Sequence, residues 1–94
     1  MSDDDPVTEA ALTDELDLHT FQPRECASVV DEYLRAARAE GFRHVRIIHG
    51  KGTGTLRRIV HAVLERHEAV ASFRLGDASG GGWGATLVRL KPKE

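Results

Sequence analysis

The chain has 94 residues, enough for one small domain, and 40% of them are hydrophobic and 30% charged. This composition is typical of a soluble globular protein and excludes a fibrous or disordered one. No stretch reaches the roughly 20 apolar residues of a membrane span, and the N-terminus lacks a basic-then-apolar signal pattern, so we expect a cytoplasmic protein without a membrane partner. The single cysteine, Cys26, has no partner for an internal disulfide, and we expect it to be a buried apolar residue.

The charges are segregated along the chain. Residues 1–17 contain seven acidic side chains and no Lys or Arg, whereas the other 77 residues carry 13 basic and 8 acidic side chains. We expect residues 1–14 to form an acidic flexible leader, residues 15–91 the folded domain and residues 92–94 a short tail. A mildly basic domain can bind phosphate backbones, but it can equally be an ordinary domain with a solubilising leader.

The first predicted element is a short strand at residues 16–19, where apolar and polar residues alternate. Leu16 and Leu18 would face the core, and Asp17 and His19 would share the opposite face. Helical periodicity then appears twice. The first helix begins near Pro23, ends before Gly41 and has the core residues Cys26, Val30, Tyr33, Leu34 and Ala37. The second ends near His67 and has the core residues Leu56, Ile59, Val60, Val63 and Leu64.

Three further strands are predicted at residues 44–49, 70–75 and 85–90, with a loop rich in Gly and Ser at 77–83. Strands that are separated by single helices usually run parallel, whereas the last two strands, joined only by a loop, suit an antiparallel pair. The expected fold is therefore an α/β sandwich of the α+β type. It has a four-stranded mixed sheet and two helices in the order β-α-β-α-β-β.

The glycine-rich turn between the second strand and the second helix lies where open sheets place their ligand sites. Glycines let a ligand approach the main chain, and the helix that follows offers free N–H groups and the positive end of its dipole. The predicted phosphate-binding residues are Gly50, Lys51, Gly52, Thr53, Gly54, Arg57 and Arg58. The turn matches neither a Walker loop nor a dinucleotide fingerprint, and a tight connection whose glycines only solve a backbone problem is an equal alternative.

Three side chains are candidates for proton transfer. If the first two strands are parallel neighbours, Asp17, His19 and His49 end adjacent strands at one edge, close to Lys51. Histidine has a pKa that suits proton transfer at neutral pH. For each histidine alone, a structural role such as a bond to the turn is the alternative. No function is assigned to the remaining histidines, which are predicted to be exposed: His44, His61 and His67.

Trp83 raises a separate question, because it lies within the run Gly80-Gly81-Gly82-Trp83-Gly84. An exposed Trp in a glycine loop can stack on a base, and such a contact would add Trp83 to the nucleic-acid-binding residues. A large aromatic side chain can instead cover the end of the core. Both interpretations remain open.

Three ordered segments resemble the motifs of the Smr (small MutS-related) domain family. Leu16-Asp17-Leu18-His19-Thr20 resembles its L-D-L-H-G motif, and His49-Gly50-Lys51-Gly52-Thr53-Gly54 matches its H-G-K-G-T-G motif. The segment from Gly81 to Val88 matches its G-G-x-G-A-T-x-V stretch. The one departure is Thr20, which would be strained if this position needs φ > 0. The resemblance covers about residues 15–91.

The resemblance implies a fold similar to the C-terminal domain of translation initiation factor 3 and an endonuclease that nicks DNA or cleaves RNA. It implies that Asp17, His19 and His49 serve cleavage or binding, with Lys51 and Gly52 in the phosphate-facing turn. We expect a stand-alone, bacterial-type member, which argues against a role in mismatch repair or on ribosomes, and a monomer. A divalent cofactor, Mg²⁺ or Mn²⁺, is optional, with Asp17, His19 and His49 as its ligand set. The alternatives are a non-catalytic DNA- or RNA-binding module and a domain that binds nucleotides or small anions.

Overall fold

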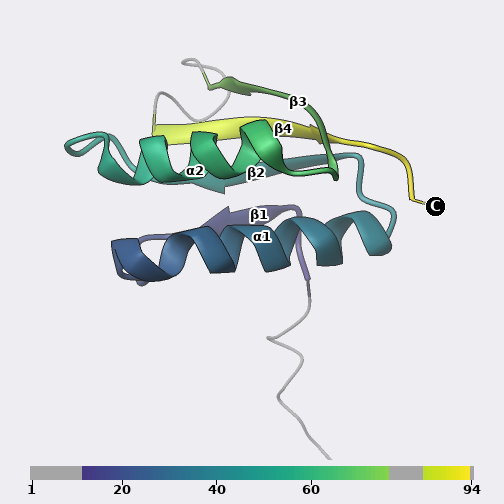
Figure 1. Ribbon diagram of the computed structural model, residues 1–94, viewed down its shortest axis with the longest axis horizontal. Coiled ribbons are helices and arrows are strands. Elements are labelled where there is room, and N and C mark those ends of the chain that lie inside the picture. Colours follow the sequence, from purple (N-terminus) through teal and green to yellow (C-terminus); the bar gives the residue numbers. More distant parts are fainter. Residues whose placement is uncertain (1–11, 77–83, 94) are drawn as a thin grey trace, which may run out of the picture.

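The computed structural model describes residues 12–76 and 84–93, in which the elements follow the predicted order (Figure 1). The strands are β1 (Glu15–Asp17), β2 (His44–Ile48), β3 (Val70–Leu75) and β4 (Ala85–Leu90), and the helices are α1 (Pro23–Ala39) and α2 (Thr55–Arg66). The predicted leader up to residue 11 and the predicted loop at 77–83 lie outside the described residues.

The four strands form one mixed sheet in the order β1-β2-β4-β3. β1 pairs with β2 in parallel, and β4 pairs antiparallel with both β2 and β3. β1, β2 and β3 therefore run in one direction, and their carboxyl ends meet the start of β4 at one edge of the sheet. We call this edge the carboxyl edge. The predicted four-stranded mixed sheet with two helices is confirmed.

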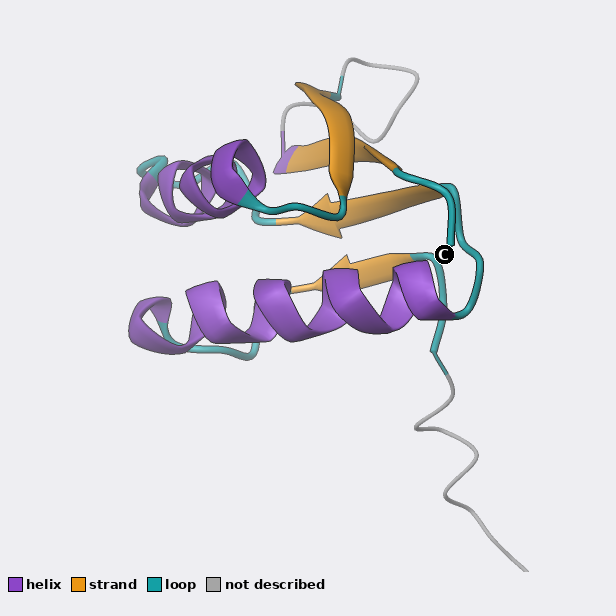
Figure 2. Cartoon of the chain, turned by 45° about the vertical axis from the view of Figure 1, so that its right-hand side comes forward, coloured by secondary structure: helices purple, strands orange, loops and turns teal. Residues whose placement is uncertain are grey.

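Both helices pack on the same face of the sheet, so the domain has two layers (Figure 2). The buried side chains of α1 are those predicted from its periodicity, and they meet alternate strand residues such as Val45, Ile47, Val88 and Leu90. In α2, Val60, Val63 and Leu64 are buried, while Leu56 and Ile59 are half-buried and pack against this core. Among residues 12–76 and 84–93, the other face of the sheet carries no helix.

Local signals fix where the elements begin and end. Pro23 is the first helical residue of α1, and the backbone N–H of Gln22 donates to the Glu25 carboxylate over 2.9 Å. Gly41 ends the helix with φ at 90°. β1 is shorter than predicted because the chain turns after Leu18, where the Phe21 N–H donates to the Leu18 carbonyl over 3.0 Å.

Two histidines that were predicted to be exposed are not. His61 of α2 is half-buried, with its ring centroid 5.1 Å from that of Phe73 of β3. The His67 side chain is 6% exposed, and its Nε2 lies 2.8 Å from a carboxylate oxygen of Asp31 on α1. In both cases a neighbouring element covers a position that looks exposed when its own helix is considered alone. His44 is exposed, as predicted.

Within the part of the chain that the structure describes, neither helix is long and apolar enough to cross a membrane.

Candidate functional site

The glycine-rich turn is held against the start of β4. The carbonyl of Gly84 accepts hydrogen bonds from the N–H groups of His49 and Gly50, over 2.9 and 2.8 Å. A Cβ at Gly84 would lie 3.4 Å from the Gly50 backbone, an ordinary van der Waals contact, so the two segments pack closely here. Gly50 and Gly54 have φ of 82° and 88°, which glycine adopts without strain. The turn is therefore fixed at both ends.

Between these fixed ends, the turn presents free donors. The N–H groups of Lys51, Gly52, Thr53 and Gly54 have no hydrogen-bond partner among the described residues. The N-cap of α2 is Gly54, which has no side chain to cap the helix, and the Thr55 N–H has only a 3.3 Å bond to the Thr53 hydroxyl. Such a run of unpaired N–H groups at a helix N-terminus favours an anion.

The charges around this helix end point the same way. The first turn of α2 contains no acidic residue and carries Arg57 and Arg58. Cations at a helix N-terminus oppose the dipole, at a cost of about 0.3–1 kcal/mol each when exposed. The Arg57 side chain folds back over Gly54, 3.1 Å from where a Cβ would stand, and Lys51 is exposed nearby. A bound anion would remove this electrostatic conflict.

Asp17 and His19 form an exposed pair at the end of β1. The His19 Nδ1 lies 2.9 Å from the Asp17 carboxylate, whose same oxygen accepts the His19 backbone N–H over 3.0 Å. The side chains are 46% and 75% exposed. The hydrogen bonds from the backbone and the ring of His19 hold the pKa of Asp17 below its ordinary value, so this carboxylate is ionised at neutral pH. The Nε2 of His19 is left free for a reacting group.

His49 is held under the turn and not at its surface. The residue is 6% exposed, its Nδ1 lies 3.0 Å from the Gly50 carbonyl, and its Nε2 lies 2.8 Å from the Thr86 hydroxyl. The same hydroxyl lies 2.8 Å from the Nε2 of His61. The fully buried Thr86 therefore joins two imidazoles, whose ring centroids are 6.1 Å apart.

Hydrogen-bond chemistry assigns the protons in this cluster. A carbonyl only accepts, so the Nδ1 of His49 carries the proton, and its bare Nε2 accepts the Thr86 O–H. The Thr86 oxygen then accepts the Nε2–H of His61. Burial lowers the pKa of both histidines, and the positive charge of Arg57 lowers them further. For His61, the neighbouring His49 also lowers the pKa. Both rings are therefore neutral at pH 7 in this arrangement.

The structure brings only part of the predicted cleavage set together. β1 and β2 are parallel neighbours, as predicted, and the Leu18 N–H donates to the Ile48 carbonyl over 2.9 Å. Asp17 pairs with Ile48 in the register, however, so its side chain lies on the open face. His49 follows Ile48 and points to the helix face, where Thr86 lies.

This geometry corrects the predicted metal-ligand set. Asp17, His19 and His49 do not converge, and across residues 12–76 and 84–93 no group of three His, Cys, Asp or Glu side chains is placed to hold a metal ion. The reason is the alternation of side chains along β2, which turns the His49 ring away from the Asp17 carboxylate.

Two residues of the site were missed by the sequence analysis. Thr86 and His61 complete the buried cluster, but His61 was predicted to be exposed and no role was predicted for Thr86 beyond its place in the Gly81–Val88 motif. Thr86 did leave a signal, since it shares the inward face of its strand with Val88 and Leu90 and is the polar residue there. Trp83, the remaining candidate, lies outside the described residues.

Comparison with known proteins identifies the family. A family model of the Smr domain matches residues 16–91. The chain is 44% identical over 82 residues to the endonuclease MutS2 of Staphylococcus carnosus and 45% identical over 83 residues to that of Geobacillus kaustophilus. These alignments cover 87% and 88% of this chain but only 10% and 11% of the relatives, so the chain spans about a tenth of their length.

Two solved structures have the same fold. The crystal structure of the Smr domain of Thermus thermophilus MutS2 matches with a TM-score of 0.80 and 40% identity, over 85% of this chain and 100% of that chain. YdaL, a stand-alone small MutS-related protein from Escherichia coli, matches with a TM-score of 0.77 and 31% identity, over 83% of this chain and 64% of that chain. The chain belongs to the Smr domain family.

Proposed function

We propose that this domain binds DNA or RNA at the carboxyl edge of its sheet and cleaves phosphodiester bonds as an endonuclease. The observation that carries the proposal is the pairing of a phosphate cradle with an exposed Asp–His pair at the same edge. The cradle consists of the free amides of residues 51–54, the uncapped N-terminus of α2 and the side chain of Lys51. The similarity to proteins named as endonucleases supports the same activity.

The exposed pair suits proton transfer. Asp17 accepts the Nδ1–H of His19, fixes the ring and stabilises the imidazolium that forms when Nε2 takes a proton. Nε2 would take that proton from the attacking water or sugar hydroxyl and return one to the leaving oxygen. Lys51 and the free amides would hold the phosphate and stabilise the charge that develops on its oxygens. A divalent ion, if one takes part, would bind Asp17 and phosphate oxygens and supply Lewis-acid chemistry.

His49 has a different place in this proposal. Both of its ring nitrogens are engaged and the residue is 6% exposed, so direct proton exchange with a substrate would require the turn to open. The contacts favour a positioning role, in which the ring fixes the Gly50 carbonyl and thereby the cradle. The prediction that His49 takes part in cleavage stays a prediction, and its variant separates the two roles.

The test is cleavage of supercoiled plasmid and of labelled RNA by the purified protein, with EDTA, Mg²⁺ or Mn²⁺. His19→Ala and Asp17→Asn should each lower the cleavage rate by about 10²- to 10⁴-fold, the usual contribution of a positioned acid–base group. Their affinity for nucleic acid should change much less. Glu68 has an exposed carboxylate beside the opposite edge of the sheet. Its variant Glu68→Gln is the matched control and should cleave at the wild-type rate.

The outcomes separate the rival functions. If His49→Ala lowers affinity and cleavage together, His49 positions the cradle, whereas lost cleavage with intact binding would make it a proton carrier. A wild type that binds DNA or RNA and cleaves neither under any metal condition would leave a non-catalytic binding module. A wild type that binds only nucleotides or inorganic phosphate would leave a small-anion-binding domain.

A further inference from the structure

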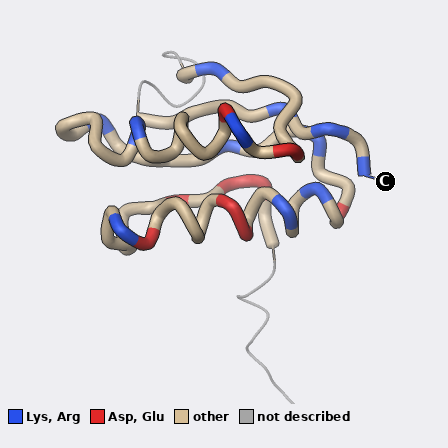
Figure 3. The backbone as a smooth tube through the Cα atoms, viewed as in Figure 1, with Lys and Arg blue, Asp and Glu red and all other residues tan. Residues whose placement is uncertain are grey.

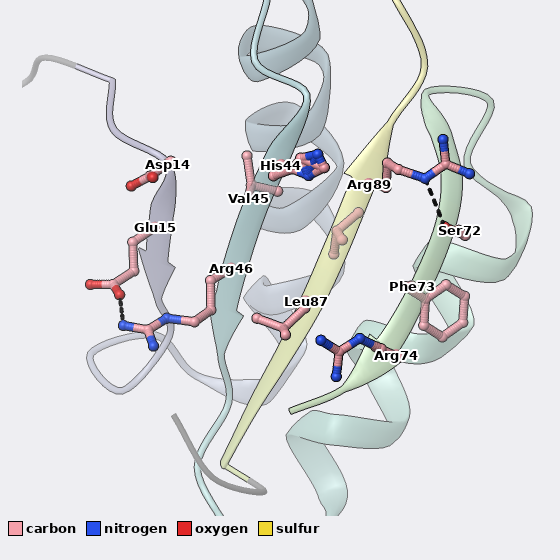
Figure 4. Close-up of a pocket in the computed structure, with 11 residues that line it drawn as sticks. Asp14, Glu15, His44, Val45, Arg46, Ser72, Phe73, Arg74, Leu87 and Arg89 are labelled. Carbon is pink, nitrogen blue, oxygen red and sulfur yellow. Dashed lines mark hydrogen bonds and ion pairs between the residues drawn. The ribbon is translucent and has the colours of Figure 1, made fainter. Parts of the chain in front are cut away.

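The open face of the sheet is a second charged surface, separate from the glycine-rich turn. It is hollowed into a shallow groove of about 590 Å³ that is lined by strand residues and the residue preceding β1, and no residue of either helix lines it. Figure 4 shows the groove with Leu87 of β4 near its centre. We call this surface the open-face groove.

Arginines from three strands surround the groove. Arg46 of β2 forms an ion pair with Glu15 of β1, so its charge is largely neutralised. Arg89 of β4 donates only to the neutral Ser72 hydroxyl, over 3.3 Å. Arg74 of β3 is exposed and has no ion-pair partner among the described residues. The side of the groove formed by β4 and β3 therefore carries two uncompensated positive charges, and the acidic residues lie at β1 (Figure 3).

The register explains why these charges gather. Arg74 is paired with Leu87 across β3 and β4, and Ser72 is paired with Arg89. Arg46 is paired with Leu87 from the other side. Leu87 of β4 thus lies between Arg46 of β2 and Arg74 of β3. Figure 4 shows the Arg74 side chain extending toward Leu87. The apolar stems of these arginines and the half-buried Leu87 together give a floor that is apolar, with the guanidinium groups as a positive rim.

The chemistry of this surface selects its occupant. A positive rim attracts phosphates, and an apolar floor with guanidinium planes accepts the faces of unpaired bases. A duplex keeps its bases stacked inside and could use only the rim. We infer that the open-face groove binds a single-stranded segment of DNA or RNA, with Arg74 and Arg89 on its phosphates and Leu87 beneath a base. The inference rests on the proposed function.

The groove and the cradle form one track. Asp17 of β1 lies on the open face and is paired with Ile48, the last residue of β2. The glycine-rich turn begins at the residue after Ile48. A single-stranded nucleic acid that is held at the carboxyl edge can therefore continue over Leu87 toward Arg89, away from the scissile phosphate. The groove would supply affinity and direction and would take no part in the chemistry.

The experiment is fluorescence anisotropy with labelled oligo(U) and oligo(dT) of about 4 to 16 nucleotides, the range that comparable single-strand sites span. The full chain is compared with the double variant Arg74→Gln/Arg89→Gln, which keeps most of each side chain, and with Lys51→Ala. Arg66→Ala is the matched control, because Arg66 is exposed at the end of α2 in the helix layer. Circular dichroism checks the folding of every variant.

The double variant should bind the longest oligonucleotides about a hundredfold more weakly, since each of the two lost charged contacts is worth about tenfold. Its slope of log K against log salt should fall by about 0.7 for each lost contact. The shortest oligonucleotides should bind as they do to wild type, while Lys51→Ala should weaken binding at every length. Arg66→Ala should match wild type throughout.

Two results would overturn the inference alone. One is wild-type affinity and slope in the double variant while Lys51→Ala still weakens binding. The other, measured with a duplex of the longest oligo(dT) as an added probe, is an equal loss for the duplex and the single strand, which would show that the groove binds phosphates without selecting unpaired bases. If the wild type binds no nucleic acid at all, the proposed function fails and the inference fails with it.

Discussion

The hydroxyl of Thr86 should contribute about 1–3 kcal/mol to the free energy of unfolding of this domain. Thr86 is fully buried and donates to His49 while it accepts from His61. Thr86→Val keeps the shape of the side chain and removes both hydrogen bonds. The variant leaves the Nε2 of His49, a 6% exposed residue, without a donor.

The magnitude follows from which partner can find water. His61 is half-buried, so its Nε2–H can turn to solvent at little cost. His49 cannot, and an orphaned buried polar group costs about 1–3 kcal/mol. For a domain of this size, a loss of about 2 kcal/mol lowers the Tm by roughly 8–16 °C. Thr86→Ser keeps the hydroxyl and loses one methyl group, which should cost about 1 kcal/mol.

The assay is urea unfolding of the wild type and the two variants, followed by thermal unfolding under the same buffer. The expected order of stability is wild type, then Thr86→Ser, then Thr86→Val. If the valine variant is as stable as wild type, or more stable than the serine variant, methyl packing and not the hydroxyl explains the burial of Thr86. That result would refute the hydrogen-bonded cluster.

Three further predictions concern the same edge of the sheet. Folding lowers the pKa values of His49 and His61, so the unfolded state takes up protons first as the pH falls. The free energy of unfolding should therefore fall as the pH drops below about 6.5, by at most about 1.4 kcal/mol per pH unit for each histidine. This slope should be shallower in His61→Asn. Gly50→Ala should lower the free energy of unfolding by about 1–2 kcal/mol, because a side chain is strained at a φ of 82°. Gly52 has open space around it and no positive φ, so Gly52→Ala should have a free energy of unfolding within about 0.5 kcal/mol of wild type. Lys51→Ala should lower the slope of log K against log salt by about 0.7 to 0.9 in a binding titration, and an unchanged slope would place Lys51 away from any phosphate.

The arrangement of the elements was largely predictable, because it follows from local periodicity. The predicted bounds of the strands at 70–75 and 85–90 match the structure, since glycine or proline marks their ends. The first strand was predicted to begin one residue late and to end two residues late. Its alternating pattern continues through His19, but the chain already turns after Leu18, which a pattern of polarity does not reveal.

The site was predictable only where its parts are neighbours in the chain. The turn at 49–54 and the pairing of Asp17 with His19 depend on residues that lie within a few positions of each other. The cluster of His49, Thr86 and His61 joins three elements, so only their packing reveals it. The same holds for the open-face groove, because strand register decides which arginines meet.

The position of β4 has a consequence for how the protein folds. β4 follows β3 in the sequence, yet it lies between β2 and β3 and hydrogen-bonds to both. During synthesis β3 therefore emerges with no partner strand, and the sheet stays incomplete until Leu90 has left the ribosome. The long separation between β2 and β4 also raises the contact order, which slows folding relative to a simple helical domain of equal length. Until that late step, β2 and β3 expose unpaired strand edges, which are open to pairing with another chain.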